Sequence, residues 1–79
     1  MNNTDVYQQV YEYLLDKQST QKTYQTLAIV LLKELGLEKA TYSQLAEDNK
    51  DYISRPHFYH IKKAHKEFIS KVVADYEKD

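Results

Sequence analysis

The sequence predicts an all-α fold, a compact four-helix domain with a short third helix and a long C-terminal helix. Only one glycine and one proline occur in 79 residues, whereas β-sandwiches and barrels need turn residues every few positions. Apolar residues also recur three and four positions apart, which is the spacing of one helix face. A chain of this length fits one domain, residues 1–79. The expected helices cover about residues 5–17, 21–35, 42–47 and 55–76.

The first expected helix begins after Thr4, because threonine commonly caps helix N-termini. Val6, Val10 and Leu14 follow at helical spacing and form one apolar side. We expect this side to face the core and the helix to end at about Lys17.

The second expected helix follows Thr20, which can cap it, and contains the most apolar stretch of the chain. Six consecutive apolar residues extend from Leu27 to Leu32. A helix that is apolar on most of its sides lies at the centre of a fold. Gly36 is the single glycine and stands just after this helix, where a left-handed C-cap is common.

The short third helix is predicted by a capping box. In this motif the Thr41 hydroxyl accepts from the Gln44 amide, and the Gln44 side chain bonds back to Thr41. Residues 48–52 are polar and non-periodic, which predicts a loop. Ser54 can cap the fourth helix, and Pro56 is tolerated in its first turn because the first amides have no intrahelical partner. No helix breaker follows, so we expect this helix to be continuous.

The fourth helix has two distinct faces when its residues are placed about 100° apart. The apolar face must pack on the other helices, and its residues are Phe58, Ile61, Ala64, His65, Phe68, Ile69, Val72 and Tyr76. The opposite face is mainly cationic, and its residues are Arg55, Tyr59, Lys62, Lys63, Lys66 and Ser70. A basic segment on a nearly neutral domain is typical of polyanion binding, although solvated helix faces also carry such charge.

Two short segments resemble a known family. Ser43–Glu47 contains a Leu–Ala pair, and after a loop Ile53–Lys63 begins with an apolar residue, a serine and an arginine, followed by apolar residues about three apart. Over residues 41–69 this pattern resembles a helix-turn-helix DNA-binding domain, as found in phage small-terminase and transposase-type domains and in winged-helix regulators. The turn is about two residues longer than in the tight motif and contains no glycine.

The resemblance implies that the fourth helix inserts into the major groove of double-stranded DNA. The implied DNA-contacting residues near its start are Ser54, Arg55, His57, Tyr59, His60 and Lys63. Four lysines would contact the phosphate backbone, namely Lys50, Lys62, Lys63 and Lys66. Arg55 suits bidentate contact with guanine or a phosphate clamp. The expected function is that of a small DNA-binding protein, either a transcriptional regulator or an accessory protein of a phage, plasmid or other mobile element.

The same composition fits a second class of protein, a helical-bundle interaction module such as an immunity, inhibitor or adaptor protein that binds no nucleic acid. Its basic face would then dock an acidic protein partner or an anionic membrane surface. A homodimer is also expected, because the tyrosines around the first helix cannot all be buried. The expected dimer residues lie on the first two helices and are Tyr7, Tyr11, Ile29 and Val30.

Other classes of function are disfavoured by the residues present. The absence of cysteine excludes disulfides and thiolate metal sites, and His57, His60 and His65 have no further ligand at a typical zinc spacing. Carboxylates occur singly and Ser54 is explained as a helix cap, so we expect no enzyme, catalytic residue, metal or cofactor. The longest apolar run is far shorter than the roughly 20 residues of a membrane span. Without an expected signal peptide, a cytoplasmic protein is predicted.

Overall fold

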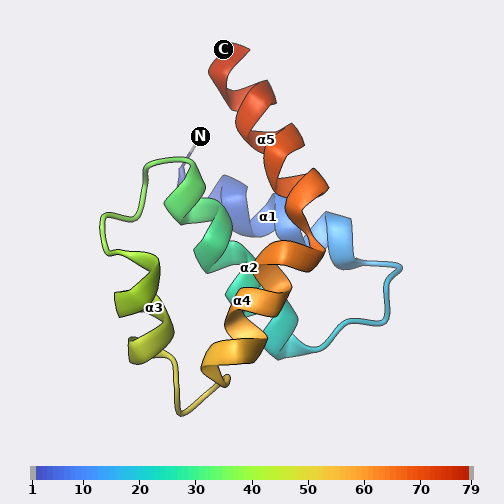
Figure 1. The fold of residues 1–79 in the computed structure, drawn as a ribbon. Coiled ribbons are helices and arrows are strands. Elements are labelled where there is room, and N and C mark those ends of the chain that lie inside the picture. The colour runs from blue at the N-terminus through green and yellow to red at the C-terminus, as the bar shows by residue number, and fades with distance from the viewer. Residues whose placement is uncertain (1, 79) are drawn as a thin grey trace.

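The computed structural model describes residues 2–78, which form five α-helices and no β-strand. Their bounds are α1 (Asn3–Leu14), α2 (Gln21–Glu34), α3 (Tyr42–Asp48), α4 (Arg55–Ala64) and α5 (Lys66–Lys78), as Figure 1 shows. The all-α class predicted from the sequence is confirmed, but the helix count is five instead of four. None of these described helices is long and apolar enough to cross a membrane.

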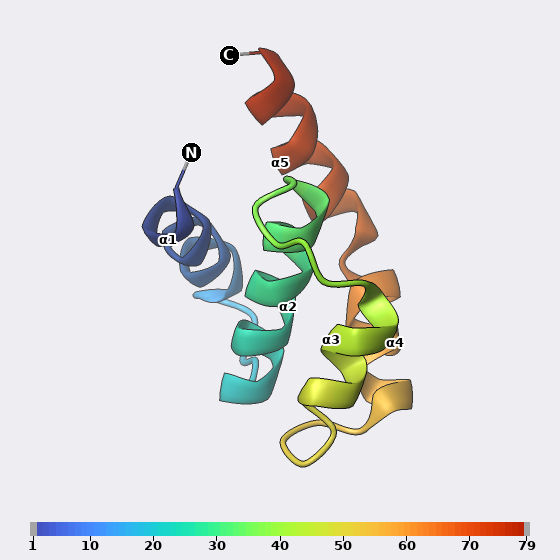
Figure 2. The same cartoon turned by 90° about the vertical axis from the view of Figure 1, so that its left-hand side faces the viewer.

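Helix α2 lies at the centre of the fold. Helices α1, α4 and α5 each pack against it, whereas α3 packs mainly against α4. Figure 2 shows α1 on one side of α2 and the last three helices on the other. Leu27, Ala28 and Leu31 have no exposed surface, because neighbouring helices cover α2 on several sides. The expectation of a central second helix is therefore confirmed.

The core forms where the neighbouring helices direct their apolar faces at α2. Val6 and Val10 of α1 and Phe58 of α4 are fully buried, and Ile69 and Val72 of α5 are nearly so. Each such side chain stabilises the fold by about 1.5–3 kcal/mol relative to full exposure. Phe58 is the largest of the fully buried side chains. It fixes the inner face of α4 and so decides which α4 residues remain exposed.

Three helix N-termini are capped as the sequence predicts. The hydroxyl oxygens of Thr20, Thr41 and Ser54 accept hydrogen bonds from backbone amides three residues later, at 3.2, 3.1 and 3.3 Å. The return bond expected in the α3 capping box is not formed. Instead, the Gln44 side chain donates to the Asp48 carboxylate at 2.6 Å, so it supports α3 one turn further along.

Helix α1 begins earlier than predicted, and its N-cap is Asn2 instead of Thr4. The Asn2 side chain accepts from the Asp5 amide at 3.0 Å, and the Asp5 carboxylate accepts from the Asn2 amide at 3.2 Å. This reciprocal pair satisfies two amides, whereas a threonine cap alone satisfies one. The helix ends at Leu14, before the predicted end. Beyond it, the amides of Leu15 and Lys17 donate to carbonyls three residues back, at 3.4 and 3.0 Å, and Gln18 then adopts the left-handed conformation with φ 48°.

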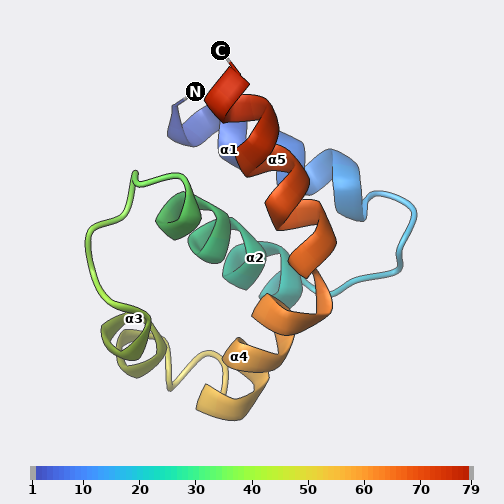
Figure 3. The same cartoon turned by 45° about the horizontal axis from the view of Figure 1, so that its top comes forward.

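The predicted continuous helix over residues 55–76 is wrong, because the chain bends between α4 and α5. His65 leaves helical geometry, with φ −111° and ψ 24°, and Figure 3 shows α5 continuing in a new direction. The bend lets Ile69 and Val72 reach the core, while Ala64, expected on the apolar face, is exposed. No glycine or proline marks this position, so the bend has its cause in tertiary packing.

One residue expected at a dimer surface belongs to the core instead. Val30 has no exposed surface, because its side of α2 is covered by other helices, and it cannot contact a second copy of the folded chain. Tyr7 and Ile29 are half-buried, and Tyr11 is 52 % exposed. Of the four expected residues, Tyr11 is therefore the most accessible.

Gly36 ends α2 in the left-handed conformation that its position predicts, with φ 80°. Its amide donates to the Lys33 carbonyl at 3.1 Å, and the Leu37 amide donates to the Leu32 carbonyl at 2.9 Å. These two bonds form a Schellman motif, which satisfies carbonyls at the end of the helix.

We expect Gly36→Ala to lower the free energy of unfolding by about 1–2 kcal/mol, because an L side chain is strained in this conformation. A Cβ there would meet no atom within 4 Å, so the variant isolates backbone strain from steric clash. Urea unfolding followed by circular dichroism measures the loss. Gly36→Asn should lose less, since asparagine tolerates this region better, and equal stability of all three proteins would contradict the assignment.

Candidate nucleic-acid interface

Helix α4 differs from the other described helices in carrying no acidic residue. It contributes Arg55, Lys62 and Lys63, and the whole stretch 52–66 contains neither aspartate nor glutamate. Because its apolar side is buried in the core, these basic groups remain on the outer side of the helix. A helix of this kind is suited to contact a polyanion.

The start of α4 is less basic than its sequence indicates, because one carboxylate binds both nearby cations. Glu47 Oε2 lies 2.8 Å from Arg55 Nη2, and Glu47 Oε1 lies 2.7 Å from Lys50 Nζ. All three side chains are about half exposed, so each ion pair stabilises the fold little. The hydrogen bond from Lys50 and then that from Arg55 lower the pKa of Glu47. In this structure Arg55 is directed at α3.

The second half of α4 and the start of α5 form a cationic hollow. Its volume is about 420 Å³, and it is lined by Glu34, Tyr59, Lys62, Lys63, Lys66, Ile69 and Ser70. Five of these residues belong to the exposed face predicted from the sequence. The structure therefore brings this face together around one hollow, except for Arg55. None of the three lysines forms an ion pair with a carboxylate in the described part of the chain. Unpaired positive charge is thus concentrated here and not at Arg55.

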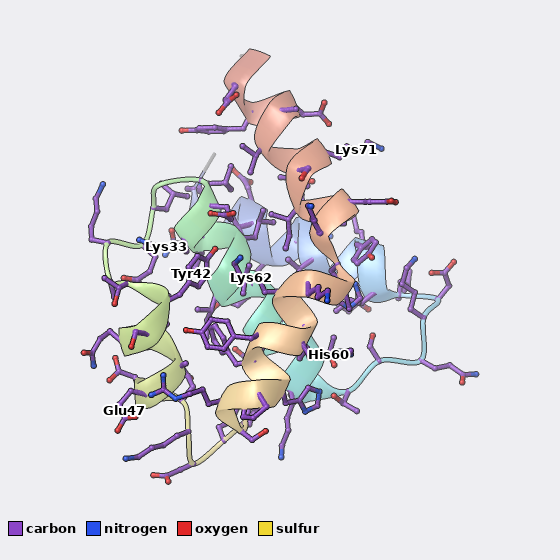
Figure 4. The ribbon with its side chains drawn as sticks, viewed as in Figure 1. Lys33, Tyr42, Glu47, His60, Lys62 and Lys71 are labelled. Carbon is purple, nitrogen blue, oxygen red and sulfur yellow. The ribbon has the colours of Figure 1, made fainter. Side chains whose placement is uncertain are left out.

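Tyr42 of α3 lies beside Lys62 and helps to position it. Lys62 Nζ lies 4.8 Å from the centre of the Tyr42 ring, and Lys33 Nζ lies 6.0 Å from it, both within the range of cation–π attraction. Figure 4 shows the two lysines on either side of Tyr42. Burial and, next, the Glu34 carboxylate raise the pKa of Tyr42 above its ordinary value.

The two exposed histidines occupy another part of α4. The rings of His57 and His60 lie 6.2 Å apart between centroids, and Figure 4 shows His60 on the side of α4 away from Lys62. Across residues 2–78, no group of three or more His, Cys, Asp or Glu side chains is placed to hold a metal ion. The third histidine, His65, faces α1, where its Nδ1 lies 2.9 Å from the Tyr13 hydroxyl.

The nine predicted DNA-contacting residues therefore separate into three groups. Ser54 caps α4, and Lys50 and Arg55 share one carboxylate, so these three are engaged within the protein. His57 and His60 form an exposed pair on one side of α4. The remaining four, Tyr59 and the three lysines, line the hollow.

Comparison of the chain with family models, with curated proteins and with solved structures found no match. The helix-turn-helix resemblance therefore depends on the sequence pattern, and the arrangement of α3 and α4 is the structural feature that bears on it. Figure 3 shows α3 nearly end-on while α4 extends across the view, so the two helices are not parallel.

Three residues that shape this surface were not predicted from the sequence, namely Glu34, Tyr42 and Glu47. Glu47 precedes Arg55 by eight positions across a loop, a separation for which no helical spacing rule predicts contact. Glu34 and Tyr42 come from different helices. One feature of the sequence could have indicated the role of Glu47: it lies only three positions before Lys50, a spacing at which ion pairs form.

We expect the pKa of Glu47 to rise towards its ordinary value when either cation is removed. Lys50→Gln and Arg55→Gln each weaken the stabilisation of the charged carboxylate. NMR titration of the Glu47 side-chain carbon measures the pKa directly. Lys39→Gln removes one positive charge from the loop after α2 and should leave this pKa unchanged. If Lys50→Gln and Arg55→Gln behave like that control, the ion pairs do not form in solution.

Proposed function

We propose that this protein binds duplex DNA through the outer face of α4. The cationic hollow carries the proposal, because Lys62, Lys63 and Lys66 surround one depression without forming ion pairs to described carboxylates. Lysines that are free of internal ion pairs can neutralise phosphates and release their counterions, which supplies much of the affinity of DNA-binding proteins. The hydroxyls of Tyr59 and Ser70 border the same hollow and could donate to phosphate oxygens.

In the proposed complex, α4 lies in the major groove and the three lysines bind the phosphate backbone beside it. His57 and His60 are exposed on α4 and would lie near base edges. Arg55 would reach DNA only after leaving Glu47, so the energy of that ion pair reduces its contribution. In this role the protein would act as a transcriptional regulator or a mobile-element accessory protein.

The salt dependence of binding tests the proposal. We expect a fluorescently labelled duplex of random sequence to bind in an anisotropy titration, with an affinity that falls steeply as salt rises. Lys62→Ala, Lys63→Ala and Lys66→Ala should each reduce the slope of log K against log[salt] by about 1. Lys71→Ala removes the same charge from α5 at a position outside the hollow, which Figure 4 shows away from Tyr42. It should leave the slope nearly unchanged.

Glu47→Gln offers a second test, in which DNA binding should become tighter instead of weaker. The substitution releases Lys50 and Arg55 and removes one negative charge, so we expect tighter binding and a steeper salt slope in the same titration. Glu38→Gln removes a charge from the loop after α2 and should change the binding less. Equal effects of the two variants would place Lys50 and Arg55 outside the DNA contact.

Absence of binding to any duplex at low salt would contradict the proposal. It would favour the alternative function, a helical interaction module such as an immunity, inhibitor or adaptor protein. One observation fits that alternative, because Leu15 after α1 is 67 % exposed and Tyr11 within α1 is 52 % exposed. Exposed large apolar side chains that lie close together are typical of protein contacts.

A further inference from the structure

A second hollow, the α1–α2 hollow, lies between the end of α1 and the start of α2. Its volume is about 440 Å³, and it is lined by Tyr11, Leu14, Leu15, Ser19, Thr20, Gln21 and Tyr24. One wall is held in place by Tyr7, whose ring lies 5.9 Å from that of Tyr24 and whose carbonyl oxygen lies 3.5 Å from the Tyr24 hydroxyl. Figure 1 shows the connection between these two helices at the edge of the molecule opposite α3.

Leu15 protrudes beside this hollow. It is 67 % exposed, and Tyr11, which lies one turn earlier on the same side of the helix, is 52 % exposed. Leaving apolar surface of this kind in water is unfavourable, so a contact that covers both side chains would be stabilising. The α1–α2 hollow therefore presents a protruding apolar side chain and a recess next to each other.

The α1–α2 hollow is also uncharged, because none of the described residues that line it is acidic or basic. The nearby carboxylates Asp5, Glu12 and Asp16 are seven and four positions apart, so they follow a neighbouring side of this segment. The cationic hollow on α4, by contrast, contains three lysines and Glu34. A second copy of the chain would meet its own charges at α4 but none in the α1–α2 hollow.

We propose that the α1–α2 hollow binds a second copy of this chain, in a two-fold dimer in which Leu15 of each copy enters the hollow of the other and contacts its Tyr11. A two-fold contact uses the same patch on both molecules, so the patch has to carry a protrusion as well as a recess. Such a contact also brings identical charges together, which an uncharged patch avoids. A different protein is commonly selected by complementary charge, and this lining offers none.

The size of the patch indicates a weak dimer. Helix α1 has 12 residues and is about 18 Å long, whereas a standard interface covers about 800 Å² on each partner, which is more than one side of such a helix provides. We therefore expect a dissociation constant in the micromolar range or higher. Small domains without disulfides often gain stability by forming oligomers, and this chain contains no cysteine.

The proposed surface differs from the dimer surface expected from the sequence, because Leu15 and the α1–α2 connection take the place of Ile29 and the buried Val30. Figure 2 shows α1 and α4 on opposite sides of α2, so the outer face of α4 would stay accessible in both copies. The dimer does not rest on the proposed DNA binding. It accounts for the exposure of Tyr11 and Leu15 without a different protein partner.

Sedimentation velocity of the whole protein, from micromolar to millimolar concentration, tests the dimer. We expect the weight-average mass to rise with concentration towards twice that of one chain. Leu15→Lys removes the protruding side chain and brings like charges together, so it should raise the dissociation constant at least about tenfold. Leu37→Lys is the matched control, because Leu37 is 38 % exposed and lies outside the hollow, and it should dimerise as the original protein does.

The salt concentration separates this proposal from the proposed function. DNA binding weakens as salt rises, whereas a contact between uncharged patches should persist. Either proposal can therefore fail while the other holds.

Disulfide trapping tests the arrangement residue by residue, because the original chain has no cysteine. Under mild oxidation, a mixture of Tyr11→Cys and Leu15→Cys should form the mixed disulfide faster than a mixture of Tyr11→Cys and Leu37→Cys, as measured by mass spectrometry. If Leu15→Lys does not fold, this comparison alone decides the question. The proposal is overturned if the original protein stays monomeric up to millimolar concentration, if Leu15→Lys dimerises as strongly as the original, or if the two mixtures cross-link at equal rates.

Discussion

The enclosure of α2 is the constraint on which the rest of this structure depends. Leu27, Val30 and Leu31 have no contact with solvent, so α1, α4 and α5 have to direct their apolar faces towards them. Hydrophobic burial is the dominant favourable contribution to folding, and a domain of this size buries a smaller fraction of its surface than a larger one. The inner residues of α4 and α5 are therefore buried in the core. The residues on the opposite sides of these helices are exposed, and the charged side chains lie there.

Within that constraint, the placement of carboxylates decides where positive charge is available. Glu47 at the end of α3 binds Lys50 and Arg55, whereas Lys63 and Lys66 have no ion-pair partner among the described residues. The available cationic surface therefore lies at the α4–α5 junction and not at the start of α4. Many helix-turn-helix proteins contact bases with the first residues of the recognition helix. In the proposed DNA complex, a contact centred further along the helix would approach the duplex at a different angle.

The fold is predictable from the sequence where residues close in the chain decide it, and less so elsewhere. The caps of α2, α3 and α4 and the left-handed Gly36 depend on bonds that span a few residues, and the central position of α2 follows from its apolar composition. The bend at His65 has no such local signal, because it accompanies the contact with Tyr13. The pairing of Arg55 with Glu47 likewise requires the loop between α3 and α4 to adopt its folded course.

The order of the helices along the chain bears on how quickly this fold assembles. Helices α1 and α2 pack together and are connected by residues 15–20, and α3 packs on α4 across residues 49–54. Closing such short loops costs little chain entropy, and helical domains rich in contacts between sequence neighbours fold within microseconds to milliseconds. The two helical pairs can form early and separately, and the docking of α4 and α5 on α2 then completes the core. Because α4 and α5 come last in the chain, the side of α2 that they cover stays exposed during synthesis until residues 55–78 can dock.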